Sequence, residues 1–297
     1  MLKVALIGPG GQLGTEIVAA KPGEVELVPL AREALDITRP EETKTFLTGL
    51  HPDVIINTAA YVRVDDAEDD AEAAFRVNAL GVKNLALAAR KTGAVLVHIS
   101  TDYVFDGSKK PSPYNEDDTP NPLSTYGISK YAGELYAENF TGSHYIVRLA
   151  GLYGRAGASG KGGNFVYTIL NKAGNGEPMT IVDDIHMSPT NAADAAKEIW
   201  RLITEERPFG LYHASNGGVC SWYEFAVKIA AMAGLKADIT PVSHTAYKTK
   251  ARRPLWSPLE SVRGIRPREW EDALKDFIGS LSLSQAKTKT ETIKTEK

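Results

Sequence analysis

The first half of the chain alternates short apolar runs with stretches of helical periodicity. The apolar runs are typical of strands and cover residues 3–7, 25–30, 53–57, 94–100 and 145–149. The helical stretches cover residues 12–20, 38 to about 49, about 71 to 92, and a segment around Tyr126. Strict alternation of strands and helices predicts an α/β fold with a doubly wound parallel sheet. In such folds ligands lie at the carboxyl ends of the strands.

The alternation stops near Ala150. Residues 155–163 form a glycine-rich loop, and residues 191–206 predict a helix that packs back on the sheet. Strand-like residues 211–214 and helix-like residues 222–233 are expected in a smaller region. The predicted organisation is one domain over residues 1–150, a smaller C-terminal region over 151–281 and a polar tail over 282–297. The tail is rich in Lys and Thr with little to bury, so we expect disorder or an appended helix without a catalytic role.

Composition narrows the class of protein. A net charge of −3 over 297 residues argues against a nucleic-acid partner. Cys220 is the single cysteine, which excludes an intramolecular disulfide and a Cys-based zinc site. No apolar run approaches the ~18 residues that a membrane helix requires. We therefore expect a soluble, cytoplasmic protein without a membrane partner.

A glycine-rich turn follows the first strand and opens the first helix. Glycine at Gly8, Gly11 and Gly14 permits a tight turn and lets backbone amides approach a pyrophosphate at the helix N-terminus. A plain strand-to-helix turn is the alternative. An NAD site usually has an acid after the second strand, whereas this chain has Arg32, which suits a 2′-phosphate. The sequence therefore favours NADPH, and it leaves NADH open because Asp36 can still contact the adenosine.

The candidate chemistry lies in Tyr126 and Lys130, which are four residues apart and so share one face of a helix. A nearby ammonium favours the phenolate, so we expect Lys130 to lower the pKa of Tyr126 and to make it a proton donor and acceptor. Thr101 follows the fourth strand and is predicted to hydrogen-bond the same substrate oxygen. The pair alone also fits an ordinary surface helix.

Several segments together resemble the extended short-chain dehydrogenase/reductase superfamily. They are residues 8–14, 52–60, 77–78, 100–107, 114–116, 122–130 and 148–154. Within that superfamily, the Gly-Gln-Leu-Gly turn, the Leu-Asp-Ile-Thr segment at 35–38 and Thr-Asp-Tyr-Val-Phe-Asp-Gly at 101–107 resemble the dTDP-4-dehydrorhamnose reductase family. This similarity covers about residues 2–281.

The resemblance implies a Rossmann-like dinucleotide-binding domain over residues 1–150 and a substrate-binding region mainly over 151–281. It implies NADPH-dependent reduction of the 4-keto group of a nucleotide-linked 6-deoxysugar, dTDP-4-dehydrorhamnose to dTDP-rhamnose, with Tyr126 as proton donor. The implied catalytic residues are Thr101, Tyr126 and Lys130, and Asp102 would join Thr101 in touching the substrate. Besides Gly8, Tyr126 and Lys130, the implied cofactor contacts are Gly11, Gln12, Leu13, Arg32, Asp36, Ile37, Ala60, Tyr61 and Val62.

The chain departs from the family pattern at Gly151, which stands where the family has a substrate-facing tryptophan. His186 lies in a segment that also differs, and we assign it no role beyond a local hydrogen bond. The basic residues between 248 and 268 are of the kind that a nucleotide-sugar diphosphate needs, and among them Arg253 resembles part of the family's substrate loop. For most of the others, diphosphate binding and a solvated basic face are both left open. Glu16 matches a metal-linked dimer contact of some relatives, but a helix-surface glutamate is the favoured interpretation. No metal ligand is predicted, and both a divalent-metal requirement and a homodimer are left open.

Two other functions compete with reduction. One is an epimerase or dehydratase on the same scaffold. Dehydratases of this superfamily carry Thr-Asp-Glu where this chain has Thr101, Asp102 and Tyr103, so the acid that elimination requires is missing. The other is a non-catalytic, dinucleotide-binding subunit resembling the regulatory subunit of methionine adenosyltransferase. Retention of Thr101, Tyr126 and Lys130 together argues against it.

Overall fold

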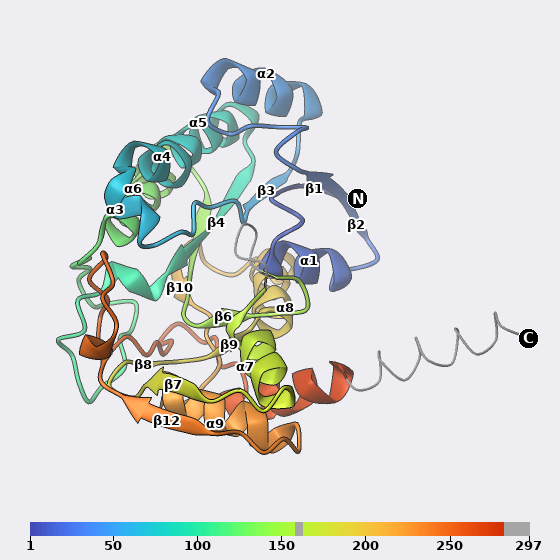
Figure 1. The fold of residues 1–297 in the computed structure, drawn as a ribbon. Helices are drawn as coiled ribbons and strands as arrows, with labels where there is room; N and C mark the ends of the chain where they lie inside the picture. Colours follow the sequence, from blue (N-terminus) through green and yellow to red (C-terminus); the bar gives the residue numbers. More distant parts are fainter. Residues whose placement is uncertain (158–162, 282–297) are drawn as a thin grey trace, which may run out of the picture.

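A six-stranded sheet forms the centre of the computed structural model, which describes residues 1–157 and 163–281 (Figure 1). Its strand order is β10-β5-β4-β3-β1-β2, and every neighbouring pair is parallel. The strands are β1 (Leu2–Ile7), β2 (Val25–Leu30), β3 (Val54–Asn57), β4 (Val95–Thr101), β5 (His144–Leu149) and β10 (Gly210–His213). The predicted doubly wound α/β fold is confirmed.

The strand order reverses direction at β1. The chain steps outward from β1 to β2 and then returns to β3 on the other side of β1. In open α/β sheets this switch point leaves a crevice at the carboxyl ends of the strands. The glycine turn after β1 and the loop at residues 58–62 after β3 therefore meet at the same place.

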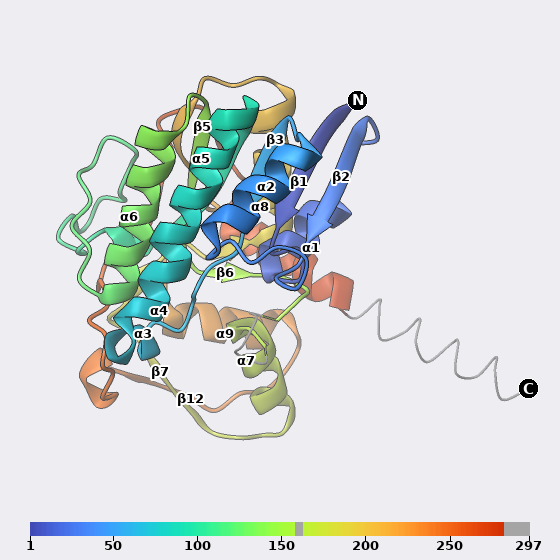
Figure 2. The same ribbon diagram turned by 90° about the horizontal axis from the view of Figure 1, so that it is seen from above.

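Helices cover both faces of the sheet. Figure 2 shows α2 (Pro40–Leu50), α5 (Val82–Thr92) and α6 (Thr125–Phe140) side by side on one face. The other face carries α1 (Gln12–Ala19) and α8 (Ala192–Thr204). Two separate apolar cores result, one on each side of the sheet.

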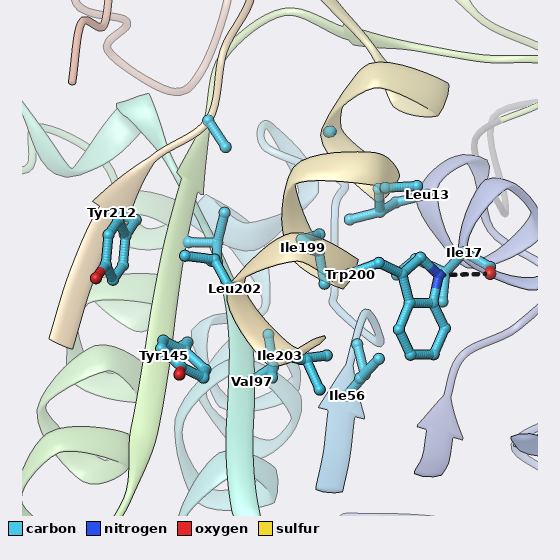
Figure 3. Packing of buried hydrophobic residues seen from close by; sticks show 14 of the residues in the cluster. Leu13, Ile17, Ile56, Val97, Tyr145, Ile199, Trp200, Leu202, Ile203 and Tyr212 are labelled. Atoms are coloured by element: carbon cyan, nitrogen blue, oxygen red, sulfur yellow. Dashed lines mark hydrogen bonds between the residues drawn. The ribbon is translucent and has the colours of Figure 1, made fainter. Parts of the chain in front are cut away.

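The core beneath α1 and α8 joins distant parts of the chain (Figure 3). Ile199 and Ile203 of α8 pack with Ile17 of α1 and with side chains of the sheet. The buried indole of Trp200 donates a hydrogen bond to the Ile17 carbonyl oxygen at 3.0 Å. The donor is satisfied without water, so this contact fixes α8 against α1 at no polar penalty.

The segment at residues 66–92 is more divided than the sequence predicted. A short helix α3 (Asp66–Asp69) precedes α4 (Ala71–Phe75), a π-helical segment η1 (Arg76–Gly81) and α5. The acidic residues Asp66, Glu68 and Asp69 lie within α3 itself. Asp70 caps α4 by accepting a hydrogen bond from the Ala73 amide at 3.0 Å. The wider turns of η1 accompany the burial of Asn78.

A smaller region packs at the carboxyl ends of the strands. It contains α7 (Phe165–Gly174), α9 (Trp222–Met232), a helical segment at 270–281, and the parallel pair β7 (Met179–Val182) and β12 (Ile239–Val242). These elements share a third apolar core. Short pairs connect it to the sheet: β6 (Leu152–Tyr153) with β9 (Thr190–Asn191), and β8 (His186–Met187) with β11 (Cys220–Ser221).

One strand was placed wrongly by sequence. Residues 211–214 were expected in the smaller region, whereas β10 pairs with β5 as the edge strand of the main sheet. Burial of Tyr212 against Tyr145 and α8 explains this, because the first five strands leave that edge open. The predicted polar tail, and part of the predicted glycine-rich loop, lie outside the described residues.

Candidate active site

The helix α6 presents the candidate catalytic residues because it packs closely on its neighbours. Ser124 caps the helix by accepting a hydrogen bond from the Gly127 amide at 3.2 Å. Two glycines permit the close approach. A Cβ at Gly127 would lie 2.3 Å from the Tyr103 carbonyl oxygen, and one at Gly133 would lie 2.2 Å from that of Asn78. Any side chain there would push α6 away from the segment after β4 and from η1.

The structure brings Thr101, Tyr126 and Lys130 together at the carboxyl end of β4. Thr101 lies beside the phenol of Tyr126, and the buried Lys130 ammonium donates to the Ile99 carbonyl oxygen at 2.6 Å. The rings of Tyr126 and Tyr103 pack edge to face, with their centroids 5.7 Å apart. The phenol and the Thr101 hydroxyl therefore lie together at the end of β4, and the ammonium is anchored to the same strand two residues before Thr101.

The expectation that the pKa of Tyr126 is lowered is wrong in this structure. Burial raises the pKa of Tyr126 above its usual value, and the negative charge of Asp102 adds to this. Burial also lowers the pKa of Lys130 to about 8, against the opposing attraction of Glu134. Tyr126 is consequently a fully protonated phenol at neutral pH, which suits a proton donor.

Asp102 is buried beside this set. Its Oδ1 accepts the Thr101 hydroxyl at 3.1 Å, and its Oδ2 accepts the Ser257 hydroxyl at 2.6 Å. Burial raises the pKa of Asp102 to about 6, while the hydrogen bonds from Ser257 and Thr101 oppose the rise. Sequence reasoning missed Ser257, because nothing local distinguishes it from any other loop serine.

The glycine turn fits a pyrophosphate. Gly8 has a left-handed φ of +78°, and a Cβ at Gly14 would lie 2.3 Å from the Gly8 carbonyl oxygen. Gly11 is the N-cap of α1 and has no side chain to cap the first amides. The buried Oε1 of Gln12 lacks a hydrogen-bond partner among the described residues. Bare amides, close backbone approach and an unpaired polar atom together are what a dinucleotide would satisfy.

The other expected cofactor contacts divide into two groups. Leu13 and Ile37 are both 4% exposed and pack in the two cores, so only their backbone remains to meet a ligand. Arg32 and Asp36 follow β2, where they form an ion pair at 3.4 Å with the Arg32 side chain 80% exposed. The arginine is therefore free to turn toward a phosphate.

Asn78 holds the loop that carries Ala60, Tyr61 and Val62. Its Oδ1 accepts from the Tyr61 amide at 2.8 Å, and its Nδ2 donates to the Tyr61 carbonyl oxygen at 3.1 Å. The same Nδ2 donates to the Ser129 hydroxyl on α6 at 3.0 Å. A single buried amide thus ties the expected cofactor loop to the helix of Tyr126. Asn78 entered the sequence analysis only within a matching segment.

A cavity of about 900 Å³ opens next to Tyr103. Its walls come from the loop after β4 and from the smaller region, and they include Phe165, Trp222, Tyr247 and Arg253. Tyr103 lines the cavity and packs on Tyr126, so the cavity borders the catalytic set. Aromatic walls with a few cations suit a ligand that has both a ring and negative charge.

Arg253 has partners already. Its guanidinium donates to Asp65 Oδ2 at 2.6 Å and to Oδ1 at 3.2 Å, and it hydrogen-bonds Tyr103. Other members of the expected basic face are also paired with acids: Lys250 with Asp69, Arg263 with Asp117, and Arg268 with Asp194 and Asp276. Each of these basic residues therefore has an acidic partner within the chain.

The two departures from the family pattern have clear surroundings. Gly151 has a left-handed φ of +51°, and a Cβ there would lie 2.7 Å from Met187 Sδ, so a larger residue requires Met187 to move. The ring of His186 lies 5.2 Å from that of Trp256, and its buried Nδ1 has no hydrogen-bond partner among the described residues. The expected local hydrogen bond of the His186 side chain is not found.

Glu16 is not the surface glutamate that the helix pattern suggested. It is 3% exposed, and both its oxygens accept from Arg155, at 2.8 and 2.6 Å. Within residues 1–157 and 163–281, no group of three or more His, Cys, Asp or Glu side chains could hold a metal ion. In the same residues no helix is long and apolar enough to cross a membrane.

The sequence and the structure of this chain are similar to those of several known proteins. The model of the RmlD substrate binding domain family matches residues 2–283. The spore coat polysaccharide biosynthesis protein SpsK of Bacillus subtilis is 37% identical, over 94% of this chain and 97% of that protein. The dTDP-4-dehydrorhamnose reductase of Sinorhizobium fredii is 33% identical, over 95% of this chain and 98% of its own. The crystal structure of dTDP-4-dehydrorhamnose reductase from Bacillus anthracis in complex with NADP matches this chain with a TM-score of 0.89 at 37% sequence identity. The match covers 94% of this chain and 100% of that one.

Proposed function

This chain belongs to the dTDP-4-dehydrorhamnose reductase family of NAD(P)H-dependent oxidoreductases that reduce the 4-keto group of nucleotide sugars, and from that membership we propose its specific reaction. The reaction is the reduction of dTDP-4-dehydrorhamnose to dTDP-rhamnose with NADPH, and Tyr126 is the proton donor. The observation that carries the proposal is the convergence of Tyr126, Thr101 and Lys130 beside the cavity bordered by Tyr103.

The residues of the glycine turn, Arg32 and the loop at 60–62 would hold the cofactor, which supplies hydride to the carbonyl carbon when bound. The substrate oxygen then gains negative charge. Tyr126 carries its proton at neutral pH because burial raises its pKa. A phenol is a stronger acid than the alcohol product, so transfer of this proton to the developing alkoxide is favourable.

Lys130 would bind the ribose of the cofactor and keep positive charge near the reacting oxygen. Its ammonium is buried and anchored by the Ile99 carbonyl oxygen, so its position relative to Tyr126 is fixed before substrate arrives. The aromatic walls of the cavity would receive the nucleotide, and Arg253 would exchange Asp65 for the diphosphate.

Tyr126→Phe tests the proposal. The variant keeps the ring but loses the proton, so we expect kcat to fall by about 10²–10⁴-fold while NADPH affinity changes little. The measurement is the decrease of NADPH absorbance with dTDP-4-dehydrorhamnose, with separate titration of the cofactor. Tyr136→Phe on the same helix, which lies outside the site, is the control. A Tyr126→Phe enzyme as fast as the parent would remove Tyr126 from the mechanism.

The same assay separates the competing functions. If the parent binds NADPH but oxidises none with any nucleotide 4-keto sugar, the non-catalytic subunit replaces the reductase. An epimerase or dehydratase would convert its substrate without net consumption of NADPH. Against the dehydratase stands Tyr103, whose pKa burial raises to about 12, in the place of a carboxylic acid.

A further inference from the structure

Two neighbouring arginines line the cavity that borders Tyr103. Among the described residues that line it, Arg252 and Arg253 are the two that carry a permanent positive charge. Arg252 is exposed, whereas the side chain of Arg253 is 23% exposed. The two arginines differ in what they bind within the chain, and so in what each can offer to an anionic ligand.

The charge of Arg253 is already shared with a carboxylate. Its Nη1 donates to Asp65 Oδ1 and to the Ala251 carbonyl oxygen, both at 3.2 Å, and its Nη2 donates to Asp65 Oδ2 at 2.6 Å. A bidentate pair of this kind neutralises the guanidinium and engages both of its terminal nitrogens. A diphosphate therefore has to compete with Asp65 for Arg253.

Arg252 has no such competitor. Among the described residues, no acidic side chain pairs with its guanidinium and no hydrogen bond engages it. A guanidinium has five N–H donors and keeps its positive charge at any working pH. The charge of Arg252 is therefore available to a ligand in the cavity without the loss of an existing ion pair.

The backbone that carries Arg252 is anchored on both sides. Before it, the amide of the buried Ala251 donates to Asp65 Oδ1 at 3.0 Å. After it, Arg253 is held by the same carboxylate. Because Asp65 fixes both neighbours of Arg252, only the Arg252 side chain itself has to be ordered when a ligand binds, which lowers the entropic cost of the contact.

We propose that Arg252 is a substrate-binding residue that contacts the diphosphate of the nucleotide sugar beside Arg253. The inference rests on the proposed function, in which the substrate carries a diphosphate. That group has two negative charges, one on each phosphate. Arg253 balances one of them once it is released from Asp65, and Arg252 balances the other. The planar fork of Arg252 also matches the spacing of two phosphate oxygens.

Arg252→Ala should weaken the binding of a nucleoside diphosphate. Loss of charge-assisted hydrogen bonds at a partly solvated site should raise the Kd for dTDP about tenfold, measured by isothermal titration calorimetry. The KM for the 4-keto substrate should rise by a similar factor, while kcat changes by less than about twofold, because the diphosphate is bound equally in the ground and transition states. A Kd for dTDP within about twofold of the parent value overturns the proposal.

Arg266→Ala is the matched control. Arg266 is also an exposed arginine of the C-terminal region, but it does not line the cavity. The two variants lose the same charge, so a general effect of net charge on an anionic ligand would appear in both. We expect the Kd of Arg266→Ala for dTDP to match that of the parent. An equal loss in the two variants would show that Arg252 makes no specific contact.

Arg252→Lys tests the chemistry of the contact. Lysine keeps the positive charge but lacks the planar fork, so its Kd for dTDP should lie between those of the parent and Arg252→Ala. A Kd no lower than that of Arg252→Ala would contradict a role based on charge. Because Arg252 is exposed, thermal unfolding of both variants should match that of the parent, which separates lost binding from lost structure.

Titration with dTDP also separates this inference from the proposed function, because it requires no turnover. If the parent oxidises no NADPH with any nucleotide 4-keto sugar, the proposed function fails, while a tenfold loss of dTDP binding in Arg252→Ala still supports the diphosphate contact. If the parent reduces dTDP-4-dehydrorhamnose but Arg252→Ala binds dTDP like the parent, only the role of Arg252 fails. Absence of dTDP binding by the parent overturns that role as well.

Discussion

Burial determines the charge state of individual side chains in this site. The same burial that keeps Tyr126 protonated lowers the pKa of Lys130 to about 8 and raises that of Asp102 to about 6. Each shift disfavours the charged form. Exposed charged residues behave differently, because solvent screens their charges and leaves their side chains free to change partners. Arg32, whose exposed side chain pairs with Asp36, is the clearest example.

Arg32→Ala should therefore reveal the cofactor preference. If Arg32 leaves Asp36 for the 2′-phosphate, its loss removes a charge-assisted hydrogen bond, and the Kd for NADPH should rise about tenfold while that for NADH stays the same. Fluorescence titration of both cofactors measures this. Arg39→Ala is a suitable control, since Arg39 is also exposed nearby but pairs with Glu42 at 2.9 Å. Equal affinities of the parent for the two cofactors would contradict the preference.

Whole elements are held in register by buried polar contacts beneath the site. Arg148 of β5 and Glu134 of α6 form two hydrogen bonds, of 2.9 and 2.6 Å, with both side chains almost fully buried. Arg148 also lies over the ring of Phe105, 5.1 Å from its centroid. In the register of β4 and β5, Arg148 lies opposite Ser100, the residue directly before Thr101. The ion pair of Arg148 with Glu134 therefore fixes α6 relative to the strand that carries Thr101.

Glu134→Gln should destabilise the protein strongly. The variant leaves the Arg148 charge buried without a counter-charge, and we expect the free energy of unfolding to fall by about 3–5 kcal/mol. Urea denaturation measures the change. Glu138→Gln, an exposed position on the same helix, should cost less than about 0.5 kcal/mol.

A double variant separates the effect of the buried charge from that of packing. Combining Glu134→Gln with Arg148→Met removes the unpaired charge and should recover much of the lost stability, because apolar replacements of buried ion pairs are often neutral. If the double variant is as unstable as the sum of the single variants, the loss comes from packing and not from the buried charge.

At the scale of the whole molecule, the sheet is completed by residues from beyond the first domain predicted by sequence. The α8 helix fills the core over α1, and β10 forms the edge of the sheet beside β5. The segment containing Arg253 and Ser257 also returns to contact Asp65 and Asp102. The large apolar face beneath α8 would be exposed without these residues.

A fragment of residues 1–150 should therefore fail to fold cooperatively. It lacks α8 and β10, so side chains such as Ile17, Val97 and Tyr145 would lose much of their apolar cover. Urea titration followed by circular dichroism should show a broad, non-cooperative change for the fragment and a sharp transition for the full chain. A sharp transition of the fragment at a similar urea concentration would show that residues 1–150 form an independent domain.

The sequence by itself determined the features that are encoded locally. Strand and helix periodicity predicted the doubly wound sheet, because each element buries one face or stripe at a fixed spacing. The glycine turn required only Gly8, Gly11 and Gly14, and the four-residue spacing of Tyr126 and Lys130 placed both on one side of a helix turn. Family resemblance then supplied the class of reaction.

Only the tertiary structure decided which distant groups meet and how far each is buried. The edge position of β10, the pairing of Glu16 with Arg155 and the contact of Ser257 with Asp102 all join segments far apart in the chain. The direction of the Tyr126 pKa shift also depended on burial, since the spacing to Lys130 showed a neighbouring charge but not the loss of water around the phenol. Periodicity specifies an element's own faces, whereas desolvation and long-range pairing exist only once the elements have packed together.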